Sequence, residues 1–360
     1  MSPVLSNYVA FGPISIGDIF CVMAIVPLLI YFKINALNVG AGVSSIVILI
    51  IGLFVLYVDG VNFGFLRMAF YYVLFFFMIS LCKLEFRAFH LVYINCSLFF
   101  SISLIIQWLI YQLLNISVPL QLPIPHYELD TLLAIDHVFR SGGWFKEPSY
   151  FAIFLAPAFF YLLHSRAYIK YSLIVIAGVV STSSLAVFLI LASIAFFFLK
   201  VREKRVSTLF LASMLVILLC SAVIFGGESI LISRVVEVFV SGGTLNERLL
   251  PMLEILHLSE SIFVNPVAHE LMLGSGDSGL VWYSSAAYML ASLGWLGYLF
   301  ISINFLRLGI LGGSLLFALT LTSHIFSNAY SFFVTIALLG LSRELGRLKS
   351  ENVGGPIATN

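Results

Sequence analysis

Apolar runs long enough to cross a membrane recur from one end of this chain to the other. A helix needs about 20 mostly apolar residues to span the hydrocarbon core of a bilayer. Only 10% of the 360 residues are charged and 61% are hydrophobic, which leaves too little charge to cover a soluble domain of this size. We therefore predict an all-α, polytopic integral membrane protein in which residues 1–360 form a single membrane domain. The sequence predicts about eleven transmembrane helices, at residues 14–32, 41–58, 63–82, 90–113, 148–163, 168–180, 182–200, 207–225, 280–303, 308–323 and 325–341.

The connections between these spans differ in positive charge. Most of the 18 Lys and Arg residues fall in one set of connections, and an excess of positive charge marks the cytoplasmic side. We therefore expect the C-terminus to lie inside. The richer set holds Lys33, Lys83, Arg87, Arg166, Lys170, Lys200, Arg202, Lys204, Arg205, Arg307, Arg343, Arg347 and Lys349, and the poorer set holds Arg67, Arg140, Lys146, Arg234 and Arg248.

Two long loops follow on the side away from the cytoplasm, at residues 114–147 and 226–279. Loops of this length in a compact chain usually serve function. In the second loop Thr244 and Glu247 have the spacing of a capping box, and the apolar residues after them favour a short helix in the membrane interface.

Several classes of function are disfavoured. The expected spans hold almost no ionisable residue at mid-membrane, where ion-coupled transporters normally place one, and Gln107 is the main deeply placed amide. No internal repeat with broken helices is seen. No basic stripe with interleaved aromatics predicts nucleic-acid binding. Residues 1–17 lack Lys and Arg, so no cleavable signal peptide is expected.

Metal and redox chemistry are not indicated either. Cys21, Cys82, Cys96 and Cys220 show no C-x-x-C spacing and lie in or beside apolar runs, as expected for small packed hydrophobes. We expect no metal and no cofactor.

The first loop ends in a segment that admits two interpretations. Pro148 suits the first turn of a helix, Glu147 then stands at the N-cap beside the positive end of the dipole, and Gly142-Gly143 allow a tight turn. In one interpretation, free amides together with Arg140 and Lys146 bind an anionic group. In the other, the segment is an ordinary loop-to-helix transition capped by Glu147.

Residues 140–152, R-S-G-G-W-F-K-E-P-S-Y-F-A, resemble the R-x-x-G-x-F-x-E-P-x-x-x-A signature of bacterial O-antigen polymerases of the Wzy type. These polymerases belong to a superfamily that includes the O-antigen ligases. The resemblance implies a multi-pass glycosyltransferase of the bacterial inner membrane. Its substrate would be an undecaprenyl-diphosphate-linked oligosaccharide on the periplasmic face, and its partners would be membrane lipid and a chain-length regulator protein.

The resemblance also implies roles for individual residues. The candidate catalytic residues are Arg140, Glu147, Arg248 and His324, and the candidate substrate-binding residues are Lys146, Ser149, Tyr150, Gly274 and Gly276. Taken without the resemblance, Arg248 is an exposed helix residue and the two glycines form a turn.

Two alternatives remain open. An O-antigen ligase is the nearest, but many ligase-type members carry a Ser-Arg pair where this chain has Ser181 to Ala186 without arginine. A lipid-linked saccharide flippase is a transporter, and the charge-poor spans with long one-sided loops count against it. The loops contain no D-x-D motif, so a metal-dependent sugar-nucleotide transferase is not expected.

Overall fold

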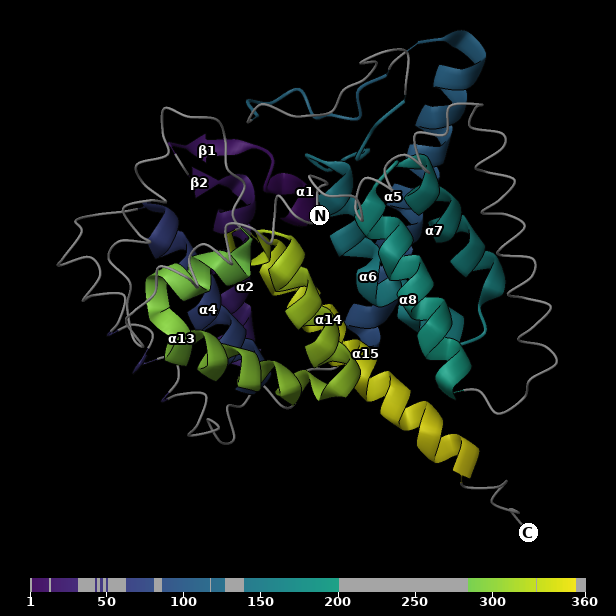
Figure 1. The fold of residues 1–360 in the computed structure, drawn as a ribbon. Helices are drawn as coiled ribbons and strands as arrows, with labels where there is room; N and C mark the ends of the chain where they lie inside the picture. The colour runs from purple at the N-terminus through teal and green to yellow at the C-terminus, as the bar shows by residue number, and fades with distance from the viewer. Residues whose placement is uncertain are drawn as a thin grey trace, which may run out of the picture.

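The computed structural model describes residues 2–12, 14–31, 43, 46–47, 50, 63–80, 86–116, 118–126, 139–200, 284–327 and 329–353. Most of these residues are helical, and the helices pack side by side as a bundle (Figure 1). The expected span at 207–225 and the second loop at 226–279 lie outside the described residues, as does most of the span at 41–58.

Each expected span within the described ranges coincides with a helix. Two stretches, Phe89–Leu114 and Gly297–Thr322, have the length and composition needed to cross a membrane. The elements are α1 Ser2–Leu5, β1 Val9–Phe11, β2 Ile14–Ser15, α2 Ile16–Tyr31, α4 Phe63–Ser80, α5 Phe86–Leu114, α6 Pro148–His164, α7 Tyr168–Val180, α8 Ser184–Lys200, α13 Ser285–Phe305, η2 Leu306–Leu308, α14 Gly309–Thr322, η3 Ile325–Ser327 and α15 Tyr330–Val353.

A short hairpin before α2 departs from the all-α prediction. Strands β1 and β2 pair antiparallel, with Val9 opposite Ser15. Ser15 then begins α2 through a capping box: its backbone N–H donates to the Asp18 carboxylate at 2.9 Å, and the Asp18 amide donates to its hydroxyl at 3.1 Å. Arg67 of α4 pairs with the same carboxylate at 2.8 Å. The ends of α2 and α4 are thereby joined.

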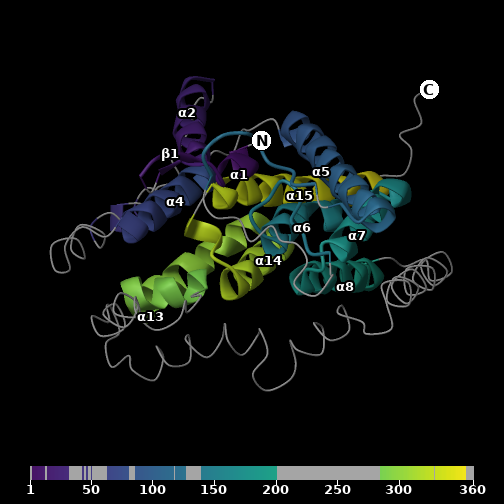
Figure 2. The ribbon, with the colours of Figure 1, turned by 90° about the horizontal axis from the view of Figure 1, so that it is seen from above.

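Helix α6 lies at the centre of one half of the bundle. It is buried along nearly its whole length and packs against α5, α7, α8 and α15. Helix α15 runs between this group and the half containing α4 and α14 (Figure 2). The start of α6 therefore stands where both halves meet.

Helices α13 and α14 form a bent pair. Gly294 interrupts α13 with a φ of 65°, and Gly309 turns the chain into α14 with a φ of 77°. A Cβ atom on Gly313 would lie 2.6 Å from the carbonyl oxygen of Phe305, so only glycine permits this close approach. The stretch Gly297–Thr322 is therefore bent at Gly309.

A tyrosine hydroxyl from α5 makes a hydrogen bond with the backbone of α6. Pro157 lies inside α6 and cannot donate a backbone hydrogen bond. Close to it, the Tyr93 hydroxyl donates to the Phe154 carbonyl oxygen at 2.5 Å. A buried backbone carbonyl near Pro157 therefore accepts a hydrogen bond from a neighbouring helix, and a buried carbonyl left without a partner would be costly.

We expect Tyr93→Phe to destabilise the protein by about 1–3 kcal/mol, because the Phe154 carbonyl loses a buried hydrogen-bond donor. Thermal unfolding of the purified protein in detergent measures this loss. Asn95→Ala, at an exposed position on the same helix, is the control and should change stability by less than about 0.5 kcal/mol. Equal unfolding temperatures for Tyr93→Phe and the wild type would contradict the assignment.

Candidate functional site

Residues 139–145, here called the strap, lie along helix α5 in the opposite direction to the helix. Five contacts fix this register: Phe139 with Tyr111 (ring centroids 5.4 Å apart), Ser141 with Gln107 (2.9 Å), Gly143 beside Leu104, Trp144 with Ser103 (3.0 Å) and Phe145 with Phe100 (ring centroids 5.2 Å apart). From Tyr111 back to Phe100 the helix rises about 16 Å. Three extended steps from Phe139 to Gly142 cover about 10 Å, and the hydrogen-bonded turn from Gly142 to Phe145 adds less than about 7 Å, so the two lengths match.

The strap presents Arg140 to the side away from α5. In an extended chain, alternate side chains point to opposite faces. Phe139, Ser141 and Phe145 are buried, whereas Arg140 is exposed. The residues that face α5 are therefore structural, and the motif's arginine is free to meet a ligand.

Gly142 and Gly143 make the turn that the sequence predicts. The Phe145 amide donates to the Gly142 carbonyl oxygen at 3.1 Å, and Gly143 adopts a φ of 64°. A Cβ atom on Gly142 would lie 2.7 Å from the backbone carbonyl of Glu147, whereas one on Gly143 would meet nothing closer than 3.6 Å. The absence of a side chain at Gly142 thus allows the strap to lie against the start of α6.

Glu147 occupies the N-cap of α6 with Pro148 in the first turn, as the sequence predicts. Its side chain does not cap the helix. One carboxylate oxygen, Oε2, accepts from the Ser149 hydroxyl at 3.0 Å, and the other, Oε1, is buried with no hydrogen-bond partner in the described part of the chain. A buried acceptor without a partner is costly, so this oxygen is suited to receive a donor from a ligand.

The first-turn amides differ from the expectation. The amides of Tyr150 and Phe151 both donate to the Glu147 carbonyl oxygen, at 3.1 and 3.3 Å. These two amides are therefore already engaged, and the cationic side chains nearby are further candidates to hold an anion.

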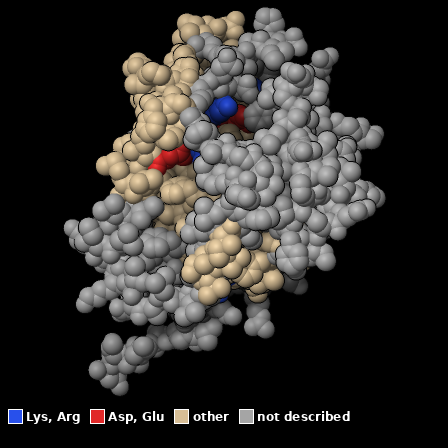
Figure 3. Space-filling view, turned by 90° about the vertical axis from the view of Figure 1, so that its left-hand side faces the viewer, with Lys and Arg blue, Asp and Glu red and all other residues tan. Residues whose placement is uncertain are grey.

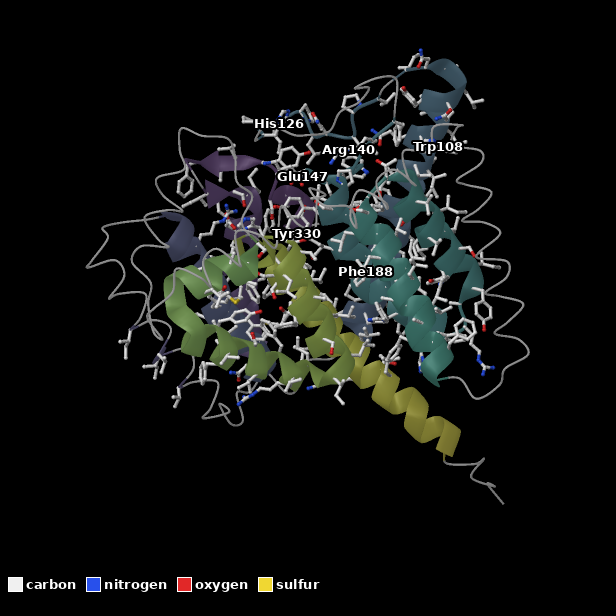
Figure 4. The ribbon with its side chains drawn as sticks, viewed as in Figure 1. Trp108, His126, Arg140, Glu147, Phe188 and Tyr330 are labelled. Atoms are coloured by element: carbon white, nitrogen blue, oxygen red, sulfur yellow. The ribbon has the colours of Figure 1, made fainter. Side chains whose placement is uncertain are left out.

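Those side chains are Arg140, which is exposed, and Lys146, which is half-buried. No ion pair joins either of them to Glu147, or to another carboxylate among the described residues. Figure 4 shows Arg140 and Glu147 at the same end of the bundle, above Tyr330. On the face drawn in Figure 3, acidic and basic groups of described residues lie close to one another.

Two tyrosines meet beside Glu147. The rings of Tyr150 and Tyr330 stack with centroids 4.8 Å apart and planes at 22°, and Phe145 lies 6.0 Å from the Tyr330 ring. Tyr330 begins α15, and its hydroxyl interacts electrostatically with Glu147. The sequence analysis did not single out Tyr330, because no local pattern links it to a residue so distant in the chain.

The N-terminal segment joins the strap to the earlier part of the first loop. The Asn7 side-chain amide donates to the Trp144 carbonyl oxygen at 3.0 Å, and the Tyr8 hydroxyl accepts from the Leu122 amide at 2.8 Å. Both side chains are buried. Sequence reasoning missed these residues as well, because single polar residues near a terminus carry no recognisable signal.

His324 is half-buried in the turn between α14 and η3. The Ser323 carbonyl accepts from the Ser285 amide at 3.0 Å, and the Phe326 amide donates to the Ser285 hydroxyl at 3.2 Å. The turn is thereby fixed to the start of α13, shortly before Tyr330 begins α15. Arg248, Gly274 and Gly276 lie outside the described residues.

Within the part of the chain that the structure describes, no group of three His, Cys, Asp or Glu residues could hold a metal ion. Comparison of the chain with protein-family models, with curated proteins and with solved structures gives no match.

We expect Gly142→Ala to lower stability more than Gly143→Ala. The first change forces backbone atoms apart, at a cost of about 3 kcal/mol. The second makes only an ordinary van der Waals contact with Leu104 at 3.6 Å and costs about 1 kcal/mol for its left-handed backbone. Thermal unfolding measures both, with Gly346→Ala in α15, where a Cβ meets nothing within 4 Å, as the unstrained control. The reverse order of the two losses would show that the strap is not seated as described.

Proposed function

We propose that this chain is an inner-membrane polymerase that joins undecaprenyl-diphosphate-linked oligosaccharide units at the periplasmic face. The product is O-antigen or a related surface polysaccharide. One observation carries the proposal: Arg140 and Lys146 lack an ion pair within the described residues. Arg140 lies at the same end of the bundle as Glu147 (Figure 4), Lys146 precedes Glu147 in the chain, and one of the Glu147 carboxylate oxygens is buried with no partner among the described residues. The resemblance of residues 140–152 to the polymerase signature gives these groups their roles.

The surface of α5 supports a membrane location. Phe100, Leu104, Gln107 and Tyr111 face the strap or its flanks, and a second set of residues, spaced three or four apart, lies on the far side of the helix. This second set is exposed although it is apolar, and such a face is suited to contact lipid chains. Its members are Phe99, Ile102, Ile106, Leu109 and Leu113. About eleven spans, with the strap on the periplasmic side, complete this arrangement.

Arg140 binds the diphosphate in this proposal. A guanidinium group is planar and presents several donors, so it can contact two phosphate oxygens at once. Lys146 adds a second positive charge, and Arg248 supplies a further guanidinium from the second loop. Together they stabilise the negative charge that develops on the leaving group.

Glu147 serves as the base. The terminal hydroxyl of the acceptor unit attacks the anomeric carbon of the growing chain, and its proton passes to the Glu147 carboxylate. The bond between that carbon and the phosphate oxygen breaks, and undecaprenyl diphosphate leaves with the electron pair. His324 is the other candidate base. Ser149 orients the Glu147 carboxylate through its hydrogen bond, and Tyr150, Gly274 and Gly276 contact the saccharide.

The energy for the reaction comes from the activated lipid diphosphate, so the proposal requires neither a nucleotide nor a metal. A chain-length regulator protein is the expected partner. The polyprenyl tails would lie against apolar helix surfaces in the bilayer, which leaves the polar groups of the strap to select the diphosphate.

Incubation of the purified protein with lipid-linked repeat units tests the proposal. We expect the wild type to make products longer than one unit, and Arg140→Ala, Arg248→Ala and Glu147→Gln to lower the rate by about 10²-fold or more. Lys170→Ala, at an exposed position at the start of α7, removes a positive charge elsewhere and should keep the wild-type rate.

The same assay separates the alternatives. A flippase would make no product longer than the repeat units supplied, under any condition. A ligase would transfer saccharide to an added lipid A-core acceptor and would not extend the lipid-linked units. Normal chain extension by both Arg140→Ala and Arg248→Ala would contradict the assignment of the site.

A further inference from the structure

We infer that Gln107 is a positioning residue that fixes Arg140 in place through the strap. This inference rests on the proposed function, in which Arg140 binds the diphosphate. Gln107 itself lies on α5 and is only 4% exposed, so it acts on the substrate through the backbone that it holds.

The Gln107 side chain joins the two ends of the first loop. Its Nε2 donates to the Val118 carbonyl oxygen at 2.6 Å, just after α5 ends, and its Oε1 accepts from the Ser141 hydroxyl at 2.9 Å, shortly before α6 begins. Ser141 in turn accepts from the Gly143 amide at 3.0 Å. A continuous chain of hydrogen bonds therefore runs from the helix into the strap.

Glutamine suits this place better than similar residues do. Its amide offers a donor and an acceptor at the same time, and the two loop ends need one of each. Glutamate would lose the donor to Val118, and leucine would lose that donor and leave the buried Ser141 hydroxyl without an acceptor for its proton. Ser141 is 1% exposed, so water is poorly placed to replace the lost bond.

This use of the amide also explains a polar side chain on an apolar helix. A buried amide is costly unless its hydrogen bonds are made, and here each end of the amide is used to order irregular backbone. Because Arg140 is bonded directly to Ser141, its direction is set by this anchor, and small displacements of a binding group are expected to reduce turnover.

Trypsin cleavage of the purified full-length protein tests the anchor without any assay of function. Trypsin cuts after Arg140, and cutting requires the strap to leave α5. We expect Gln107→Leu to raise the rate of this cleavage about tenfold or more, and Ser141→Ala to raise it as well, in case Gln107→Leu does not fold. Ser97→Ala is the matched control: Ser97 is buried on the same helix, and its hydroxyl donates to the Tyr93 carbonyl at 2.9 Å within that helix. Unchanged cleavage in both strap variants would overturn the inference.

Polymerisation kinetics then test positioning. Gln107→Leu should lower kcat/KM about tenfold in a protein that carries Arg140, and should have no further effect in an Arg140→Ala background, because the two changes remove the same interaction. Equal effects in both backgrounds would overturn the positioning role. If the wild type makes no product longer than one repeat unit, the proposed function fails. The cleavage rates still decide whether Gln107 holds the strap.

Discussion

The docking of the strap on α5 is the constraint on which the candidate site depends. Phe139, Ser141 and Phe145 are buried against the bundle, and Gly142 allows the strap to touch the start of α6. With these positions occupied by packing, Arg140 and Lys146 remain to meet a ligand, and Glu147 begins the most buried helix of its half of the bundle. The motif thus combines residues that hold the backbone with residues that are displayed by it.

Several polar groups of α5 hold backbone outside that helix. Gln107 and Ser103 bind the strap, and the Tyr93 hydroxyl donates to the Phe154 carbonyl of α6. Each group makes hydrogen bonds that would be costly to leave unmade away from water. Helix α5 therefore contacts both the strap and the helix that begins after Glu147.

Features that depend on local sequence could be predicted, and features that depend on long-range contacts could not. The helices follow from the length of the apolar runs, and the N-cap position of Glu147 follows from Pro148 beside it. The stacking of Tyr150 on Tyr330 and the bond from Asn7 to Trp144 join distant segments, and no spacing rule indicates them. The hairpin before α2 was missed because its strands are too short to show an alternating pattern.

A disulfide between α5 and the strap tests the register most directly. A Cβ atom on Gly143 would lie 3.6 Å from the Cβ of Leu104, within the range of about 3.5–4.5 Å that disulfides require. In a protein whose own cysteines are replaced, Leu104→Cys with Gly143→Cys should cross-link under mild oxidation, whereas Leu104→Cys with Phe139→Cys should not. Failure of the first pair to cross-link, or equal cross-linking of both pairs, would contradict the position of the strap and the site built on it.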